Sequence, residues 1–109
     1  MSNLYADIGE DCIEFTDDLK IYIKKELTAG NQIDIEEYAF SAAKAKSNDV
    51  AAVTASGIMS IMLSIVRIEE KGETKGPLTI DEIKQLRRHI FAKLLREVNK
   101  RNIPLDILE

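Results

Sequence analysis

The sequence predicts an all-α protein: a four-helix bundle-like single domain with a central apolar helix (about 49–71) and a short apolar C-terminal tail. Three observations support this class. Two segments carry the helix-start pattern of a capping box, apolar residues recur at intervals of three and four, and no run alternates convincingly between apolar and polar residues. With 109 residues, of which 45% are hydrophobic and 31% charged, the chain suits one globular domain over residues 1–109.

The first predicted helix covers about residues 3–29. Its apolar residues step by three and four along the chain, which would place them on one helix face. Gly9 weakens the first turns, and Gly30 follows as a stop signal because glycine tolerates the left-handed conformation found after helices. The apolar face comprises Tyr5, Ile8, Cys12, Phe15, Leu19 and Tyr22.

The second predicted helix begins at Asp34 and ends near Lys46. Asp34 and Glu37 have the spacing of a capping box, in which each side chain accepts a hydrogen bond from the other residue's backbone N–H. Ile33 and Tyr38 flank this box as an apolar pair that can fix the entry of the chain into the helix. The apolar face of this helix comprises Ile35, Tyr38, Ala39, Ala42 and Ala43.

The third predicted helix, about residues 49–71, follows the turn-forming residues 47–49 and has no charged residue from Val50 to Val66. A membrane span would need about 20 mostly apolar residues, whereas this stretch is shorter and contains several Ser and Thr residues. We therefore expect a helix that its neighbours bury at the centre of the bundle. Any part of it left uncovered is a candidate surface for self-association.

The fourth predicted helix follows a loop at residues 72–77 and covers about residues 79–102. Thr79 and Glu82 form the second capping-box pattern, flanked by the apolar pair Leu78 and Ile83. Pro104 ends the helix, and the apolar tail at residues 105–108 is expected to dock on its own domain or on a partner. The inner face of the helix comprises Ile83, Leu86, Ile90, Leu94 and Val98.

Charge is unevenly distributed along the chain, whose formal net charge is -4. The first predicted helix is acidic and the last is basic, so the two helices either pair with each other or present binding surfaces. An acidic face suits a basic protein partner, and a basic helix suits the phosphates of nucleic acid. The candidate partner-binding residues are Asp7, Glu10, Asp11, Glu14, Asp17 and Asp18, and the alternative nucleic-acid-binding residues are Lys84, Arg87, Arg88, Arg96 and Arg101.

An enzymatic alternative comes from paired carboxylates. Asp11 with Glu14, and Asp34 with Glu37, are spaced so that each pair would lie on one helix face and could hold Mg²⁺. This arrangement resembles all-helical nucleotide pyrophosphohydrolases and implies their Mg²⁺-dependent activity, although that family's pattern contains more Glu at stricter spacing. With one Cys, one His and no phosphate-binding Gly-rich loop, the chain is otherwise expected to have no catalytic residues, no metal site and no cofactor.

The leading hypothesis is a small acidic helical protein–protein interaction module that is not an enzyme. In size, charge and expected helix content the chain resembles bacterial immunity proteins, phage-encoded inhibitors and accessory regulatory subunits. That resemblance implies a partner protein, of basic character if the acidic face is the contact surface, and homo-oligomerisation is a further expectation. Nucleic acid is a less favoured partner, and no membrane contact is expected. A single Cys and the lack of a secretory signal predict a cytoplasmic location.

Overall fold

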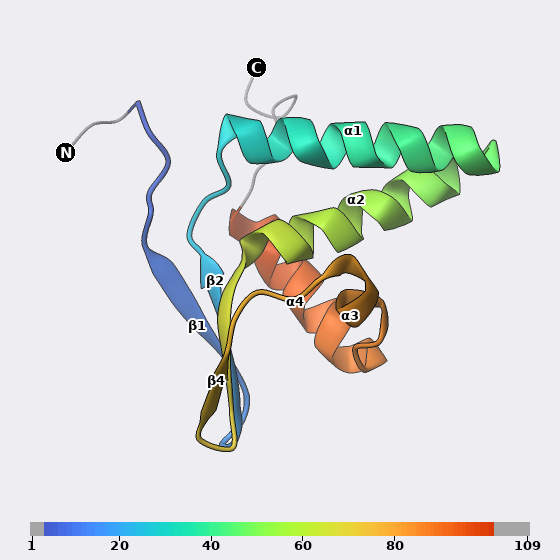
Figure 1. Cartoon of the computed structure of the whole chain (residues 1–109). Coiled ribbons are helices and arrows are strands. Elements are labelled where there is room, and N and C mark those ends of the chain that lie inside the picture. Colours follow the sequence, from blue (N-terminus) through green and yellow to red (C-terminus); the bar gives the residue numbers. More distant parts are fainter. Residues whose placement is uncertain (1–3, 102–109) are drawn as a thin grey trace.

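The computed structural model describes residues 4–101 of the chain (Figure 1). It has a mixed α/β fold, so the all-α, four-helix bundle prediction is wrong. It contains a four-stranded antiparallel sheet, and three of the four strands lie in two regions that were predicted to be helical. The apolar tail at residues 105–108 lies outside the described residues. The elements in chain order are β1 (Glu10–Thr16), β2 (Leu19–Lys24), α1 (Ala29–Lys46), α2 (Asp49–Ser64), β3 (Ile65–Glu70), β4 (Glu73–Lys75), α3 (Ile80–Lys84) and α4 (Arg88–Arg101).

The segment predicted as the first helix forms a β-hairpin instead. β1 pairs antiparallel with β2, and Thr16 lies opposite Leu19 across a two-residue turn. In β2, Leu19, Ile21 and Ile23 alternate with polar residues or tyrosine and point to one face of the sheet. Because isoleucine is β-branched, it also favours a strand locally. The apolar residues on which the helix prediction relied form no single face, because they are spread over the segment before β1, over β1 and over β2.

Helix α1 begins five residues before the predicted start. Thr28 is its N-cap, and the Asn31 backbone N–H donates to the Thr28 hydroxyl at 3.0 Å. The Asn31 side chain accepts a hydrogen bond from the Thr28 backbone N–H at 3.0 Å and completes a capping box. The predicted cap at Asp34 is therefore wrong, and Asp34 lies inside the helix.

Helix α2 begins at Asp49 as predicted, but it ends at Ser64 and continues directly into β3. The buried Ser64 hydroxyl donates to the Ser60 carbonyl at 2.6 Å, so burying it leaves no hydrogen-bonding group unsatisfied. β3 returns as β4 through Lys71 and Gly72, which both have positive φ as a tight hairpin turn requires. The predicted helix does not reach residue 71 because the backbone becomes extended at Ile65, where β3 begins.

The capping box predicted at Thr79 is confirmed. The Glu82 backbone N–H donates to the Thr79 hydroxyl at 3.2 Å, and the Glu82 carboxylate accepts from the Thr79 backbone N–H at 3.0 Å. The helix that follows is short, however, because α3 ends at Lys84 and a separate helix, α4, starts at Arg88. The single helix predicted over residues 79–102 is therefore two helices, α3 and α4.

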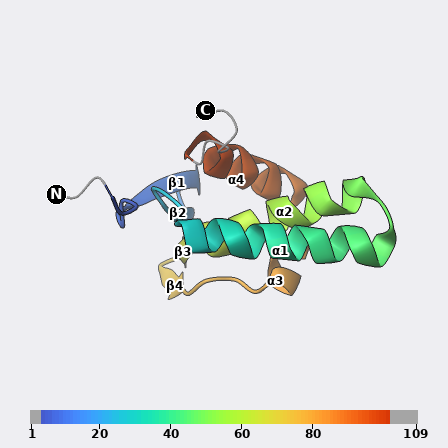
Figure 2. The same cartoon turned by 90° about the horizontal axis from the view of Figure 1, so that it is seen from above.

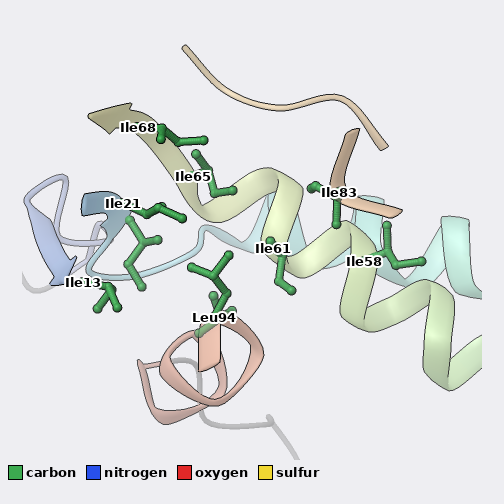
Figure 3. Close-up of a cluster of buried hydrophobic side chains, with 10 residues drawn as sticks. Ile13, Ile21, Ile58, Ile61, Ile65, Ile68, Ile83 and Leu94 are labelled. Atoms are coloured by element: carbon green, nitrogen blue, oxygen red, sulfur yellow. The ribbon is translucent and has the colours of Figure 1, made fainter. Parts of the chain in front are cut away.

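The sheet has the order β1-β2-β3-β4 with every neighbouring pair antiparallel. Strands β2 and β3 are adjacent although the whole α1–α2 hairpin separates them in sequence. Side chains from the sheet, α2, α3 and α4 form one core against one face of the sheet (Figure 3). Leu94 and Ile61, both 0% exposed, lie at its centre. Within the described residues, no helix combines the length and the apolar character needed to cross a lipid bilayer.

The hairpin of α1 and α2 extends well beyond the sheet (Figures 1 and 2). We call α1 and the first half of α2, residues 29–57, the arm. The radius of gyration is 14.5 Å, larger than the roughly 13 Å expected for a compact domain of this length, as a projecting arm requires. Within α1 only Ile35 is buried, so the arm contributes little to the core.

Candidate partner-binding site

The outer face of α1 carries two large apolar side chains in contact with solvent. Ile33 is 54% exposed and Phe40 is 71% exposed. They are seven residues apart, which is two helical turns, so they lie on the same side of the helix. Ile35, the buried residue of α1, lies roughly 140–160° away around the helix axis from both. We define the outer face of α1 as Ile33, Glu36, Glu37, Phe40 and Lys44, all of which are exposed.

Charge along the outer face of α1 changes sign from its first half to its second. Glu36 and Glu37 precede Phe40, and Lys44 follows it. Within residues 4–101, Glu37 and Lys44 form no ion pair, and Glu36 only accepts a weak hydrogen bond from Gln32 at 3.4 Å. The outer face therefore combines an apolar centre with charges that are free to pair with another molecule.

A second exposed apolar pair lies on α2. Val50 and Val53 are each 74% exposed. Gly57 lies two turns beyond Val50 on the same side of α2, and a Cβ atom added there would be 3.4 Å from Leu95 Cδ1 of α4. Helix α4 thus covers this side of α2 at Gly57 and leaves Val50 and Val53 uncovered. The third predicted helix is therefore not covered over its first turns, and its buried residues begin at Ala55.

The acidic residues predicted to bind a partner do not form the helix face that the prediction required. Alternation along β1 places Glu10 and Glu14 on one side of the strand and Asp11 on the other. Glu10 pairs with Arg67, while the Asp11 carboxylate accepts from Arg101 Nε at 2.8 Å. The Asp7 carboxylate accepts a hydrogen bond from the Gly9 backbone N–H, and Asp17 and Asp18 form the β1–β2 turn.

The basic residues proposed for nucleic acid are only partly available. Lys84, Arg87, Arg88 and Arg96 are exposed, but Arg101 is bound to Asp11 and to Glu97, whose carboxylate it contacts at 3.0 Å. Lys93 of the same helix donates to the Glu14 carbonyl at 2.7 Å. The predicted pairing between an acidic first segment and a basic last segment thus exists in part, between β1 and α4.

A network of polar side chains covers the sheet face opposite the core. The Tyr22 hydroxyl donates to Glu69 Oε2 at 3.1 Å, and Arg67 Cζ lies 3.8 Å from the centre of the Tyr22 ring. A hydrogen bond with Cys12, partial burial and the neighbouring Glu69 raise the pKa of Tyr22. Arg67 also pairs with Glu10, which raises the pKa of Arg67. Tyr22 and Arg67 therefore keep their ordinary protonation states at neutral pH and hold three strands together.

A shallow polar hollow lies where the two β-hairpins turn. Its volume is about 340 Å³. The Lys71 backbone N–H donates to the Asp18 carbonyl at 2.8 Å and ties the two turns together. Within residues 4–101, no group of Asp, Glu, Cys or His side chains is placed to hold a metal ion. The hollow is lined by Asp17, Asp18, Lys20, Glu69, Gly72 and Thr74.

The arrangement needed for the Mg²⁺-dependent alternative is not formed. That hypothesis placed Asp11 and Glu14 on one face of a helix opposite Asp34 and Glu37. In the structure the first two residues belong to a strand and, three positions apart, point to opposite faces of the sheet. The carboxylate pair that was to bind one side of the metal is therefore split.

The cluster of Asp11, Glu97 and Arg101 predicts how stability depends on pH. Hydrogen bonds from Arg101 and then Lys100 lower the pKa of Glu97 below its usual value of 4.5. Since a lowered pKa means that the folded state binds this proton less well, Glu97 stabilises the fold above about pH 4.5 and loses this effect as pH falls through its folded-state pKa. We expect Glu97→Gln to melt a few degrees below the native protein at pH 7, with the gap closing towards pH 3. A gap that stays constant in thermal melts across this range would contradict the assignment.

Comparison of the chain with models of protein families, with curated proteins and with solved structures finds no match. The candidate site therefore rests on the geometry of this chain alone. From the sequence, Ile33 was expected only to flank a helix cap, and no role was expected for Phe40. The signal was present, because Phe40 is a large apolar residue outside the predicted apolar face that contains Ile35.

Proposed function

We propose that this chain is a protein–protein interaction module that binds another protein molecule through the outer face of α1. The observation that carries the proposal is the exposure of Ile33 and Phe40 on the same side of a projecting helix. Burying an exposed phenylalanine side chain on binding contributes up to about 1.5–3 kcal/mol. Aromatic residues including phenylalanine are enriched in protein interfaces, whose rim is polar. The single Cys of the chain suits action in a reducing compartment such as the cytoplasm.

The geometry of the arm supports this surface over the originally proposed acidic one. The acidic residues of β1 and its flanks point in several directions, and Glu10 and Asp11 already pair with cations of the same chain. In contrast, Glu37 and Lys44 beside Phe40 form no ion pair within the described residues. A partner can therefore pair with them without breaking an existing contact.

A capture experiment tests the proposal. Tagged protein is incubated with a lysate of its native host that also expresses an untagged copy of the chain, and the bound proteins are quantified. We expect the Ile33→Ser/Phe40→Ser variant to lose at least about tenfold of one bound protein, because removing two apolar anchors costs more than 1.4 kcal/mol. Both positions are exposed, so the fold should tolerate the changes.

Val53→Ser is the matched control, because it makes the same kind of change at an exposed apolar position of the other arm helix. It should capture the same proteins as the native chain. If the Ile33→Ser/Phe40→Ser variant retained every bound protein, or if Val53→Ser alone lost one, the outer face of α1 would not be the binding surface.

A further inference from the structure

Resting on the proposed function, we propose that the molecule bound by the outer face of α1 is a second copy of this chain. In this dimer the two α1 helices run antiparallel, and Phe40 of each copy lies next to the two-fold axis. The contact is isologous, so the same residues from both copies form it.

The order of charges along α1 favours this pairing. If Phe40 faces Phe40 across a two-fold axis between antiparallel helices, residues at equal distances before and after it face each other. Glu36 lies four residues before Phe40 and Lys44 lies four after it, so each Glu36 faces Lys44 of the second copy. Glu37 is close to the same lysine. Symmetry repeats the pairing, and a parallel arrangement would instead place glutamates beside glutamates.

The shape of the molecule leaves room for this contact. Helix α1 packs mainly against α2, and none of the described elements covers α1 in the view from above (Figure 2). Its outer face points away from the sheet and from α4. A second arm can therefore lie along it without displacing any described element.

The small size of the contact predicts a weak dimer. A stable complex usually buries about 800 Å² on each partner, whereas two crossing helices with two large apolar side chains each bury less. We therefore expect a reversible dimer with a dissociation constant on the order of 10–100 µM, as is common for small interfaces. Both oligomeric forms should be visible over an accessible concentration range.

Sedimentation equilibrium of the purified chain over about 1–500 µM brackets this range and tests the proposal. The native chain and the control Val53→Ser should dimerise equally, and Phe40→Ser should weaken dimerisation at least about tenfold because the central apolar contact is lost. Circular dichroism of each variant establishes that it remains folded.

Charge reversal supplies the sharper test. The Glu36→Lys/Glu37→Lys variant should be monomeric, because its new cations face Lys44 of an identical copy. The Lys44→Glu variant should be monomeric for the opposite reason. An equimolar mixture of the two should dimerise again, because every facing pair in the mixed dimer has opposite charges.

The proposal is overturned if the native chain stays monomeric over the whole series, if Val53→Ser rather than Phe40→Ser dissociates it, or if the mixture stays monomeric. The capture experiment separates this failure from failure of the proposed function. A monomeric chain that still captures a different protein through Ile33 and Phe40 retains its function and excludes the dimer. If no captured protein and no dimer depends on these residues, both proposals fail.

Discussion

Replacing Leu94 with alanine is expected to lower the free energy of unfolding by about 3 kcal/mol, within the range for large-to-small changes in protein cores. Leu94 is fully buried and extends from α4 towards the isoleucines of the sheet and of α2 (Figure 3). Its truncation would leave a cavity where α4 meets the sheet and α2. Domains of this size are stabilised by only about 5–15 kcal/mol, so the loss is a large share of the total.

Thermal and chemical denaturation measure this effect. We expect the Tm of Leu94→Ala to fall by roughly 10–20 °C. The control is Phe40→Ala, which removes a larger side chain at a position that is 71% exposed and should change stability by less than about 0.5 kcal/mol. Similar losses for the two variants would show that α4 does not pack on the sheet as described.

Ile35→Ala is expected to destabilise α1 selectively. Ile35 is 4% exposed and is the only buried residue of α1. Removing it costs about 2–4 kcal/mol, and the loss falls on a helix that has few other buried contacts. Because α1 lies outside the main core, it can open while the sheet, α4 and the second half of α2 stay folded.

Hydrogen exchange followed residue by residue distinguishes local from global opening. In Ile35→Ala the amides of α1 should exchange at least about 30-fold faster, the factor that 2 kcal/mol implies, while those around Ile21 and Ile61 change much less. Ile33→Ala, two residues away on the exposed side, is the control and should leave α1 protected. Uniform acceleration across the chain would mean that the arm and the core unfold as one unit.

The start of a helix could be predicted from the sequence where only one set of nearby residues can form the cap. Thr79 and Glu82 form the predicted capping box, and the predicted start at Asp49 is confirmed. The box predicted at Asp34 failed because Thr28 and Asn31 offer an equivalent cap one turn and a half earlier. Starting there lengthens α1 and adds hydrogen bonds, so the longer helix is favoured.

The strands were not predicted because a strand is stabilised mainly by its pairing with neighbouring strands, which can be distant in sequence. Leu19, Ile21 and Ile23 alternate over too few residues to outweigh a helical reading of the same segment. β2 is stable because β1 and β3 supply hydrogen bonds on both sides. The partner β3 comes from far along the chain, where the uncharged stretch after Val50 looked like one continuous helix. After β3 the chain turns at Lys71 and Gly72, which both have positive φ, and forms a hairpin with β4.

The starts of α2 and α3, and the residues of α1 that turn inwards, could be predicted from the sequence, because caps and helical spacing act over a few neighbouring residues. Tertiary structure decided the fold class, since a sheet needs partners distant in sequence. It also decided the candidate site. Phe40 is exposed only because α2 covers the opposite side of α1 and nothing in the described chain covers this one. A residue's exposure depends on what packs against it, and that is a property of the whole molecule.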